Sequence, residues 1–342
     1  GLHHLIWEVL DNAVDEAING YASTIQVTLG KDGETITVED NGRGIPVETH
    51  PKDPEGRSTL EVIYTVLHAG GKFEQGAYRT AGGLHGVGAS VVNALSSKLV
   101  VQVRRGGQLH EQKFRRGVPL GPVAVVGEAR GSGTKVLFKP DPRIFPKTEF
   151  DPALIARRLE VKTYLNGGLR IVWRNETAKD KDERVTEFRH DGGIVEYLED
   201  LIEARDRRPV LEELFTVERD EADGRLHIAL SWTESTDVVL HSFVNGIPTQ
   251  DGGTHESGLR DAINRAVRAY LDVHDIVPRG VSITSDDIRE GLTAAVNLFI
   301  AEPQFQGQTK EKLNNPEVRA FVSGIVRPAL EQWLNAHQTQ AQ

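Results

Sequence analysis

The sequence predicts an α+β protein of two domains, and three observations support this. The chain has 342 residues, which at about 150 residues per domain is enough for two. Apolar residues recur with the helical period in 2–18 and alternate with the strand period in 24–29 and 35–39. A highly charged stretch, Lys179 to Arg189, separates two series of such elements, and we interpret it as the domain boundary.

Composition excludes several classes of protein. Lys plus Arg number 40 and Asp plus Glu number 50, a net charge of −10, so the surface is not basic throughout and any nucleic-acid contact must be local. No stretch approaches the ~20 apolar residues of a membrane span, and no signal-peptide pattern is present, so we expect a cytoplasmic protein without membrane contact. Because Cys is 0, disulfides, thiolate zinc sites and cysteine nucleophiles are excluded.

The first predicted helix runs from Leu2 to Ile18 and ends at Gly20. Its apolar residues form one face, and its other face is polar, with His4, Glu8, Asp11, Asn12 and Asp15. A solvated acidic face would explain this pattern. The alternative is a general base, Glu8, which is oriented by His4 and stands beside a magnesium ligand, Asn12. That alternative requires a phosphate site nearby.

The strands at 24–29 and 35–39 form a predicted hairpin, which is followed by the loop Asp40-Asn41-Gly42-Arg43-Gly44-Ile45-Pro46. Such a stretch is also an ordinary turn. However, Asp40 is a lone carboxylate beside the apolar residues Val38 and Ile45. A carboxylate in an apolar slot is suited to accept a hydrogen bond from an exocyclic amine.

Seven glycines lie between Gly70 and Gly88, a density that no helix or strand tolerates. We therefore predict a long functional loop there, running into a helix at 89–95. Glycine-rich backbone before a helix N-terminus offers free N–H donors and the positive end of the helix dipole, which suits a polyphosphate. The spacing is not that of a P-loop, and no strand leads into 83–88 as a dinucleotide fingerprint requires.

Further strands are predicted at 99–104, 109–114 and 134–139, and a helix capped by Asp151 follows, ending near Leu165. The second half reads as an α/β domain with strands at 226–232, 238–244 and 293–300, a helix at 256–270 and a helix from Pro316. Lys310 is by default a solvated loop residue, and 337–342 is expected to be frayed.

Six segments together, in order, resemble the ATPase region of bacterial type II topoisomerases, most closely the DNA gyrase B family. They are residues 8–17, 39–46, 67–73, 82–88, 251–255 and 308–310. The resemblance implies a Bergerat (GHKL) ATPase domain, a two-layer α/β sandwich, over residues 1–190. It implies a ribosomal-S5-like α/β transducer domain over residues 191–342.

The resemblance also implies roles for individual residues. Glu8 is similar to the general base for the attacking water, His4 to its orienting partner and Asn12 to the ligand of Mg²⁺. Lys310 and Gln308 resemble the transducer residues that reach the terminal phosphate of ATP, where Lys310 is catalytic. Asp40 resembles the adenine-reading carboxylate, with Thr134 beside it. The other residues that the resemblance assigns to the nucleotide are Glu16, Arg43, Gly44, Ile45, Pro46, Lys72, Tyr78, Gly82, Gly83, Leu84, His85, Gly86, Val87 and Gly88.

The function implied is ATP binding and hydrolysis with Mg²⁺, coupled to dimer closure, DNA strand passage and negative supercoiling. The implied partners are the gyrase A subunit, in an A2B2 complex, and DNA through that complex. Homodimerisation on ATP is expected to need the family's N-terminal arm, which lies before the point where this sequence starts. No DNA cleavage by this chain alone is expected.

Two alternatives remain open at this point, the ATPase region of a topoisomerase IV B subunit and a nucleotide-gated clamp with little hydrolysis of its own. A separate hypothesis concerns DNA. The local basic clusters Arg104-Arg105 and Arg115-Arg116 are candidate contacts for it.

Overall fold

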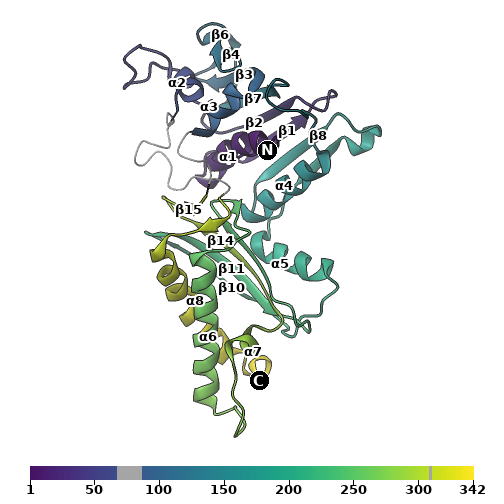
Figure 1. The fold of residues 1–342 in the computed structure, drawn as a ribbon, viewed down its shortest axis with the longest axis vertical. Coiled ribbons are helices and arrows are strands. Elements are labelled where there is room, and N and C mark those ends of the chain that lie inside the picture. The colour runs from purple at the N-terminus through teal and green to yellow at the C-terminus, as the bar shows by residue number, and fades with distance from the viewer. Residues whose placement is uncertain (68–86, 308–309) are drawn as a thin grey trace. The chain divides into compact units, whose positions relative to one another are not determined.

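The structure is a computed structural model that describes residues 1–67, 87–307 and 310–342. The chain forms two compact units, residues 1–191 and residues 192–342 (Figure 1). The charged stretch 179–189 lies inside the first unit, where Val185–Phe188 forms a strand.

The first unit contains a nine-stranded mixed sheet. Its helices are α1 (His4–Ile18), α2 (Thr59–Thr65), α3 (Val87–Ala94), α4 (Pro152–Leu165) and the 3₁₀ turn η2 (Lys181–Glu183). Its strands are β1 (Thr24–Leu29), β2 (Ile36–Asp40), β3 (Ser96–Arg105), β4 (Gln108–Arg115), β5 (Val118–Pro119), β6 (Ala124–Glu128), β7 (Gly133–Pro140), β8 (Arg170–Asn175) and β9 (Val185–Phe188). The order is β5-β4-β3-β7-β2-β1-β8-β9, with β6 beside β4. Within the described residues of this sheet, only the β1–β8 pair is parallel.

Helices cover one face of this sheet (Figure 1). Buried and half-buried positions alternate along β1 and β2, as expected for strands with one covered face. The core joins these strands to the apolar stripe of α1, including Leu5, Ile6 and Leu10. The two-layer arrangement of mixed α+β class predicted from the sequence is therefore confirmed. The sequence missed β5, β6, β8, β9 and α2, which are short or lack a clear period.

The polar face predicted for α1 is divided between two environments. Asp11 is 7% exposed and pairs with the buried Lys162 of α4, whose Nζ lies 3.0 Å from Asp11 Oδ1. Glu8 and Asn12 are half-buried and His4 is exposed. The interpretation as one solvated acidic face was therefore wrong for Asp11 and also for Asp15, which is 1% exposed. At Asp11 a helix from much further along the chain covers that edge.

The second unit contains a five-stranded sheet of order β10-β11-β14-β12-β13 and a separate two-stranded hairpin, β15–β16. Its strands are β10 (Phe215–Glu221), β11 (Gly224–Trp232), β12 (Val239–Val244), β13 (Ile247–Pro248), β14 (Leu292–Phe299), β15 (Phe305–Gln306) and β16 (Lys312–Leu313). Its helices are α5 (Gly193–Ala204), α6 (Thr254–His274), α7 (Ser285–Arg289), α8 (Pro316–Ala336) and α9 (Gln338–Ala341).

Both faces of the second sheet are covered. The side chains of α6 and α8 pack with alternate residues of β11 and β14, such as Ile228 and Val296, whereas α5 packs on Ala229 and Ala295 of the opposite face. This explains why every residue of the central strand β14 is buried. The expectation that residues 337–342 are frayed is wrong. Residues 338–341 form α9, and the Gln340 side chain accepts a hydrogen bond from the Glu212 backbone N–H at 3.1 Å.

Within the described residues, no helix is long and apolar enough to cross a membrane.

Candidate functional site

The polar ridge of α1 lies against the first turn of α3. Gly88 is so close to Glu8 that a Cβ atom at position 88 would overlap the carboxylate oxygen Oε2. The residues that precede α3 are the glycine-rich stretch of the sequence, so that stretch ends beside the ridge. The hypothesis of a general base required a phosphate site nearby, and the assignment of the glycine-rich segment to phosphates stays a prediction.

Asp40 ends β2 as a buried carboxylate, 8% exposed, opposite Thr134 of β7. Its Oδ1 accepts a hydrogen bond from the Gly42 backbone N–H at 2.8 Å. The pKa of Asp40 is raised to about 6, mainly by burial and also by the nearby charge of Glu16, while hydrogen bonds from the backbone amides of Gly42 and Thr134 oppose the shift. Asp40 is therefore a buried hydrogen-bond acceptor whose pKa, about 6, lies above the usual value for an aspartate.

Arg43 in the loop after β2 is fixed from two sides. Its Nη2 lies 2.8 Å from Glu16 Oε1, its Nε donates to Glu16 Oε2 at 3.3 Å, and its backbone N–H donates to the same Oε2 at 3.1 Å. The guanidinium lies over the ring of Tyr21, 3.7 Å from its centroid. Glu16 thus holds the loop through Arg43, a role the sequence did not reveal.

The next residues of this loop meet β3 and β7. Gly44 has a φ of +81°, and a Cβ there would lie 2.9 Å from the Arg104 carbonyl oxygen. The Ile45 backbone N–H donates to Thr134 Oγ1 at 3.1 Å, so Thr134 lies beside both Asp40 and Ile45. Pro46 is exposed. The structure therefore brings Asp40, Arg43, Gly44, Ile45 and Thr134 together, and their assignment to a nucleotide stays a prediction.

Three arginines of the basic clusters singled out in the sequence, Arg104, Arg105 and Arg116, have partners inside the first unit. Arg104 Nη2 donates to the Asp40 carbonyl at 3.3 Å, and Arg105 Nη1 donates to the Gly44 carbonyl at 3.1 Å. Arg116 Nε lies 2.9 Å from Asp141 Oδ2. Arg104 and Arg105 therefore brace the loop that follows β2.

Lys310 belongs to the second unit and is 6% exposed. It lies between β15 and β16 with a φ of +58°, in the left-handed region. The default expectation of a solvated loop residue is therefore wrong. Several other predicted site residues lie outside the described part of the chain, namely Lys72, Tyr78, Gly82, Gly83, Leu84, His85, Gly86 and Gln308. Val87 begins α3.

Two residues that sequence reasoning missed contribute to the site's surroundings. Tyr21 supports Arg43, and Lys162 neutralises Asp11 on the helix that carries Glu8. The sequence signal for the role of Tyr21 was weak, since it was only that this aromatic residue directly follows Gly20, where the first helix ends. The position of Lys162 within a predicted helix gave no signal, because lysine is usually exposed.

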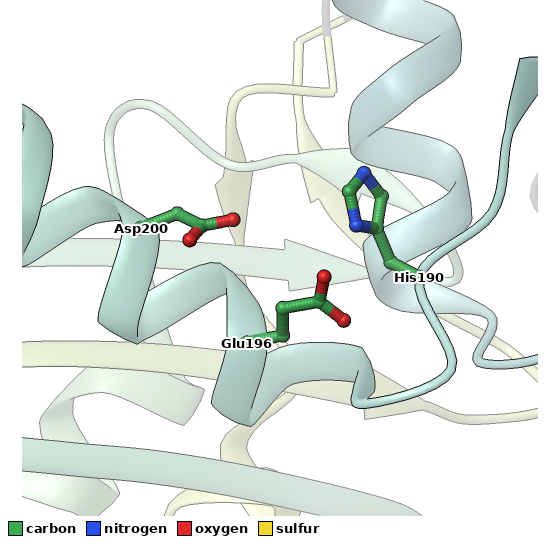
Figure 2. A group of neighbouring side chains, drawn as sticks. All are labelled: His190, Glu196 and Asp200. Carbon is green, nitrogen blue, oxygen red and sulfur yellow. The ribbon is translucent and has the colours of Figure 1, made fainter.

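Figure 2 draws another group of polar side chains, His190, Glu196 and Asp200. Within the first unit, the His190 ring stacks on Tyr164 with centroids 3.7 Å apart, and its Nε2 lies 3.2 Å from Glu160 Oε1. Within the second unit, Glu196 Oε2 accepts a hydrogen bond from the Gly192 backbone N–H at 3.2 Å, at the start of α5. These contacts within each unit account for His190 and Glu196, and we assign no metal to them.

Comparison with known proteins identifies both units. Residues 1–144 match the family model described as histidine kinase-, DNA gyrase B-, and HSP90-like ATPase, and residues 193–342 match the DNA gyrase B model. A solved structure, the 43K ATPase domain of Thermus thermophilus gyrase B in complex with an aminocoumarin, has a TM-score of 0.82 at 38% identity. That match covers 99% of this chain and 86% of that one. The chain belongs to the DNA gyrase B family.

Curated members of the gyrase B family and of its topoisomerase IV relatives match equally well. The gyrase B protein of Thermotoga maritima is 44% identical over 98% of this chain and 53% of its own length. The topoisomerase IV B protein of Caulobacter vibrioides is also 44% identical, over 100% of this chain and 50% of its own length. The topoisomerase IV ATP-binding domain of Francisella tularensis has a TM-score of 0.82 at 34% identity, over 99% of this chain and 88% of that one. The chain thus spans about half the length of the curated relatives it matches.

Proposed function

We propose that this chain is the ATP-hydrolysing part of a DNA gyrase, whose ATP binding, dimer closure and hydrolysis drive DNA strand passage and negative supercoiling. Its first unit is a GHKL-type ATPase domain by family. The single observation that carries the proposal is the close approach of Gly88 to Glu8. It places the end of a glycine-rich segment and a helix N-terminus directly beside a candidate general base.

Asp40 recognises the adenine. Its buried carboxylate accepts a hydrogen bond from the exocyclic amine, and the cost of burying its charge falls when that donor is present. Thr134, Gly44 and Ile45 form the neighbouring wall, and Arg43 is held at its edge by Glu16 and Tyr21. An adenine with its amine is thus favoured over a base that presents a carbonyl at that position.

Glu8 is the general base, and His4 orients it from one turn earlier on α1. Glu8 takes a proton from the water that attacks the terminal phosphorus, the bond to the bridging oxygen breaks, and ADP leaves. Asn12 fits Mg²⁺, because a half-buried carboxamide oxygen one turn from Glu8 is a suitable hard ligand. When bound, Mg²⁺ neutralises charge on the phosphates.

The remaining predicted contacts fall on the segment before α3, with Lys72, Tyr78 and the backbone of 82–88 for the phosphates, and on Gln308. Lys310 of the second unit supplies positive charge to the terminal phosphate. Residues 1–190 are then the nucleotide-binding domain and residues 191–342 the transducer domain, which senses the nucleotide state through Lys310.

The whole protein is proposed to act in the cytoplasm with gyrase A subunits, in an A2B2 complex, and with DNA. A topoisomerase IV B subunit is the second candidate, because the topoisomerase IV B protein of Caulobacter vibrioides matches at the same 44% identity. Reconstitution of the whole protein with its A subunit distinguishes the two. Negative supercoiling of relaxed DNA supports gyrase, and efficient decatenation without supercoiling supports topoisomerase IV.

The first experiment measures ATP hydrolysis against protein concentration for the wild-type chain and Glu8→Ala, beside equilibrium binding of a non-hydrolysable ATP analogue. We expect turnover that rises faster than linearly with protein and is lost in Glu8→Ala, while analogue binding persists. Equal loss of binding and turnover in Glu8→Ala would contradict the role of Glu8. Binding without turnover in both proteins would favour the nucleotide-gated clamp.

A further inference from the structure

The segment 251–253 of the second unit runs beside β16 and bonds to it through the backbone. The Asp251 backbone N–H donates to the Glu311 carbonyl at 2.9 Å, and the Leu313 backbone N–H donates to the Gly252 carbonyl at 3.0 Å. Gly253 forms a parallel β-bridge with Leu313. This segment therefore acts as a third strand beside a hairpin that otherwise has only two.

The hairpin needs that support. Strands β15 and β16 pair with each other at only two positions, Phe305 with Leu313 and Gln306 with Lys312. Within the described residues they are separate from the five-stranded sheet. A short two-stranded hairpin alone is marginally stable. The backbone bonds from 251–253 therefore help to fix where β16 lies, together with the buried Leu313 and the Asn314 backbone N–H, which donates to the Gln304 carbonyl at 2.7 Å. Lys310 is two residues before β16 begins.

Only glycine permits this approach. Gly253 has a φ of +139°, and a Cβ there would overlap the backbone carbonyl of Leu313 and lie 2.6 Å from its nitrogen. Gly252 has a φ of +71°, and a Cβ there would overlap the carboxylate of Glu256. At Gly253 both the backbone conformation and the closeness of β16 therefore exclude a side chain, whereas at Gly252 the backbone conformation disfavours one and the neighbour that would have to move is the Glu256 side chain.

The segment is itself anchored to the core of the second unit. Glu256, in the first turn of α6, is 7% exposed and accepts a hydrogen bond from Ser242 Oγ of β12 at 2.8 Å. Thr249 Oγ1 lies 2.7 Å from the same Ser242 Oγ and 2.9 Å from Nε2 of the fully buried His255. These bonds tie the segment to β12 and α6, so β16 is fixed relative to the five-stranded sheet.

We propose that Gly252 and Gly253 are positioning residues for Lys310, because they hold β16, and with it Lys310, in the place that ATP hydrolysis requires. This inference rests on the role given to Lys310 under the proposed function. It assigns a purpose to the Asp251-Gly252-Gly253-Thr254-His255 motif, none of whose residues needs to touch the nucleotide.

The experiment compares Gly253→Ala and Gly252→Ala with a matched control, Gly280→Ala. Gly280 has a φ of +84° in the same unit but nothing within 4 Å of its Cβ position, so its substitution strains the backbone without displacing a neighbour. We measure ATP turnover, equilibrium binding of a non-hydrolysable ATP analogue, and hydrogen exchange of the backbone amides of residues 311–313.

For Gly253→Ala we expect turnover to fall about 10- to 100-fold, because a displacement of about 1 Å at a reacting group has an effect of this size. Analogue binding should stay within about twofold, since the adenine and general-base residues lie in the first unit. Amide exchange at 311–313 should rise at least tenfold. Gly252→Ala should behave in the same way more weakly, because its new Cβ meets a side chain. Gly280→Ala should match the wild type in all three measurements.

Unchanged exchange at 311–313 in both Gly253→Ala and Gly252→Ala, or raised exchange with full turnover, would overturn the inference. A Lys310→Ala variant separates this result from a failure of the proposed function. If Lys310→Ala loses turnover but the glycine variants do not, the positioning role is wrong and the role of Lys310 stands. If Lys310→Ala hydrolyses ATP normally, the role of Lys310 is wrong and the inference fails with it.

Discussion

Gly88, in the first turn of α3, lies so close to Glu8 on α1 that the two positions cannot both carry side chains without displacement. The Glu8 carboxylate is therefore confined by backbone on one side and by its own helix on the other. Confinement of this kind reduces the number of side-chain rotamers that the carboxylate samples, and it keeps the carboxylate at one place.

The first prediction concerns that contact. Gly88→Ala should push the Glu8 carboxylate aside and lower ATP turnover about 100-fold, the range expected when a general base is misplaced. Turnover and analogue binding should be measured together with Gly127→Ala as the control, since Gly127 has nothing within 4 Å of its Cβ position. Normal turnover in Gly88→Ala would show that the position of the carboxylate is not limiting.

The second prediction is a pH dependence of adenine recognition. The pKa of Asp40 is raised to about 6, mainly by burial, and only the ionised carboxylate is a pure acceptor. Affinity for adenosine, which has no phosphate to titrate, should therefore be about tenfold weaker at pH 5 than at pH 7.5. Calorimetric titration over this range is the measurement. A flat profile would contradict the assignment of Asp40 to the exocyclic amine.

The third prediction is that Asp40→Asn stabilises the protein without nucleotide. The folded state keeps the Asp40 proton up to about pH 6, whereas the unfolded state loses it near 3.8, so stability falls as pH rises between these values. The shift of about 2 units corresponds to an upper limit of about 3 kcal/mol. Urea unfolding should show a gain at pH 8 that shrinks at pH 5. A gain of equal size at both pH values would point to another cause.

The fourth prediction concerns the buried pair Lys162 and Asp11. Lys162→Met should lower the free energy of unfolding by about 3–5 kcal/mol, because it leaves the carboxylate of Asp11 buried without its cation. The double variant Asp11→Asn with Lys162→Met should recover most of that loss, since neither of the two positions then carries a buried charge. Unfolding in urea measures both. No recovery in the double variant would show that the lysine stem, rather than charge pairing, provides the stability.

Much of the fold could be predicted from local pattern. The end of α1 before Gly20, the β1–β2 hairpin, the Asp151 cap of α4 and the long helices α6 and α8 follow from periodicity and capping. Elements such as β6, β9 and α5 were missed. Strands β6 and β9 are short and largely exposed, and they owe their structure to a neighbouring strand. Helix α5 packs against a sheet whose strands come later in the sequence.

The sequence by itself determined the α+β class, the family resemblance and the identity of the candidate chemical groups, because side-chain type and spacing are local properties. Tertiary structure decided which groups meet. It buried Asp11 against Lys162, set Glu16 to hold Arg43, raised the pKa of Asp40 and buried Lys310 in the turn beside β16. Each of these depends on desolvation and on contacts between residues far apart in the chain, and no local pattern encodes either of them.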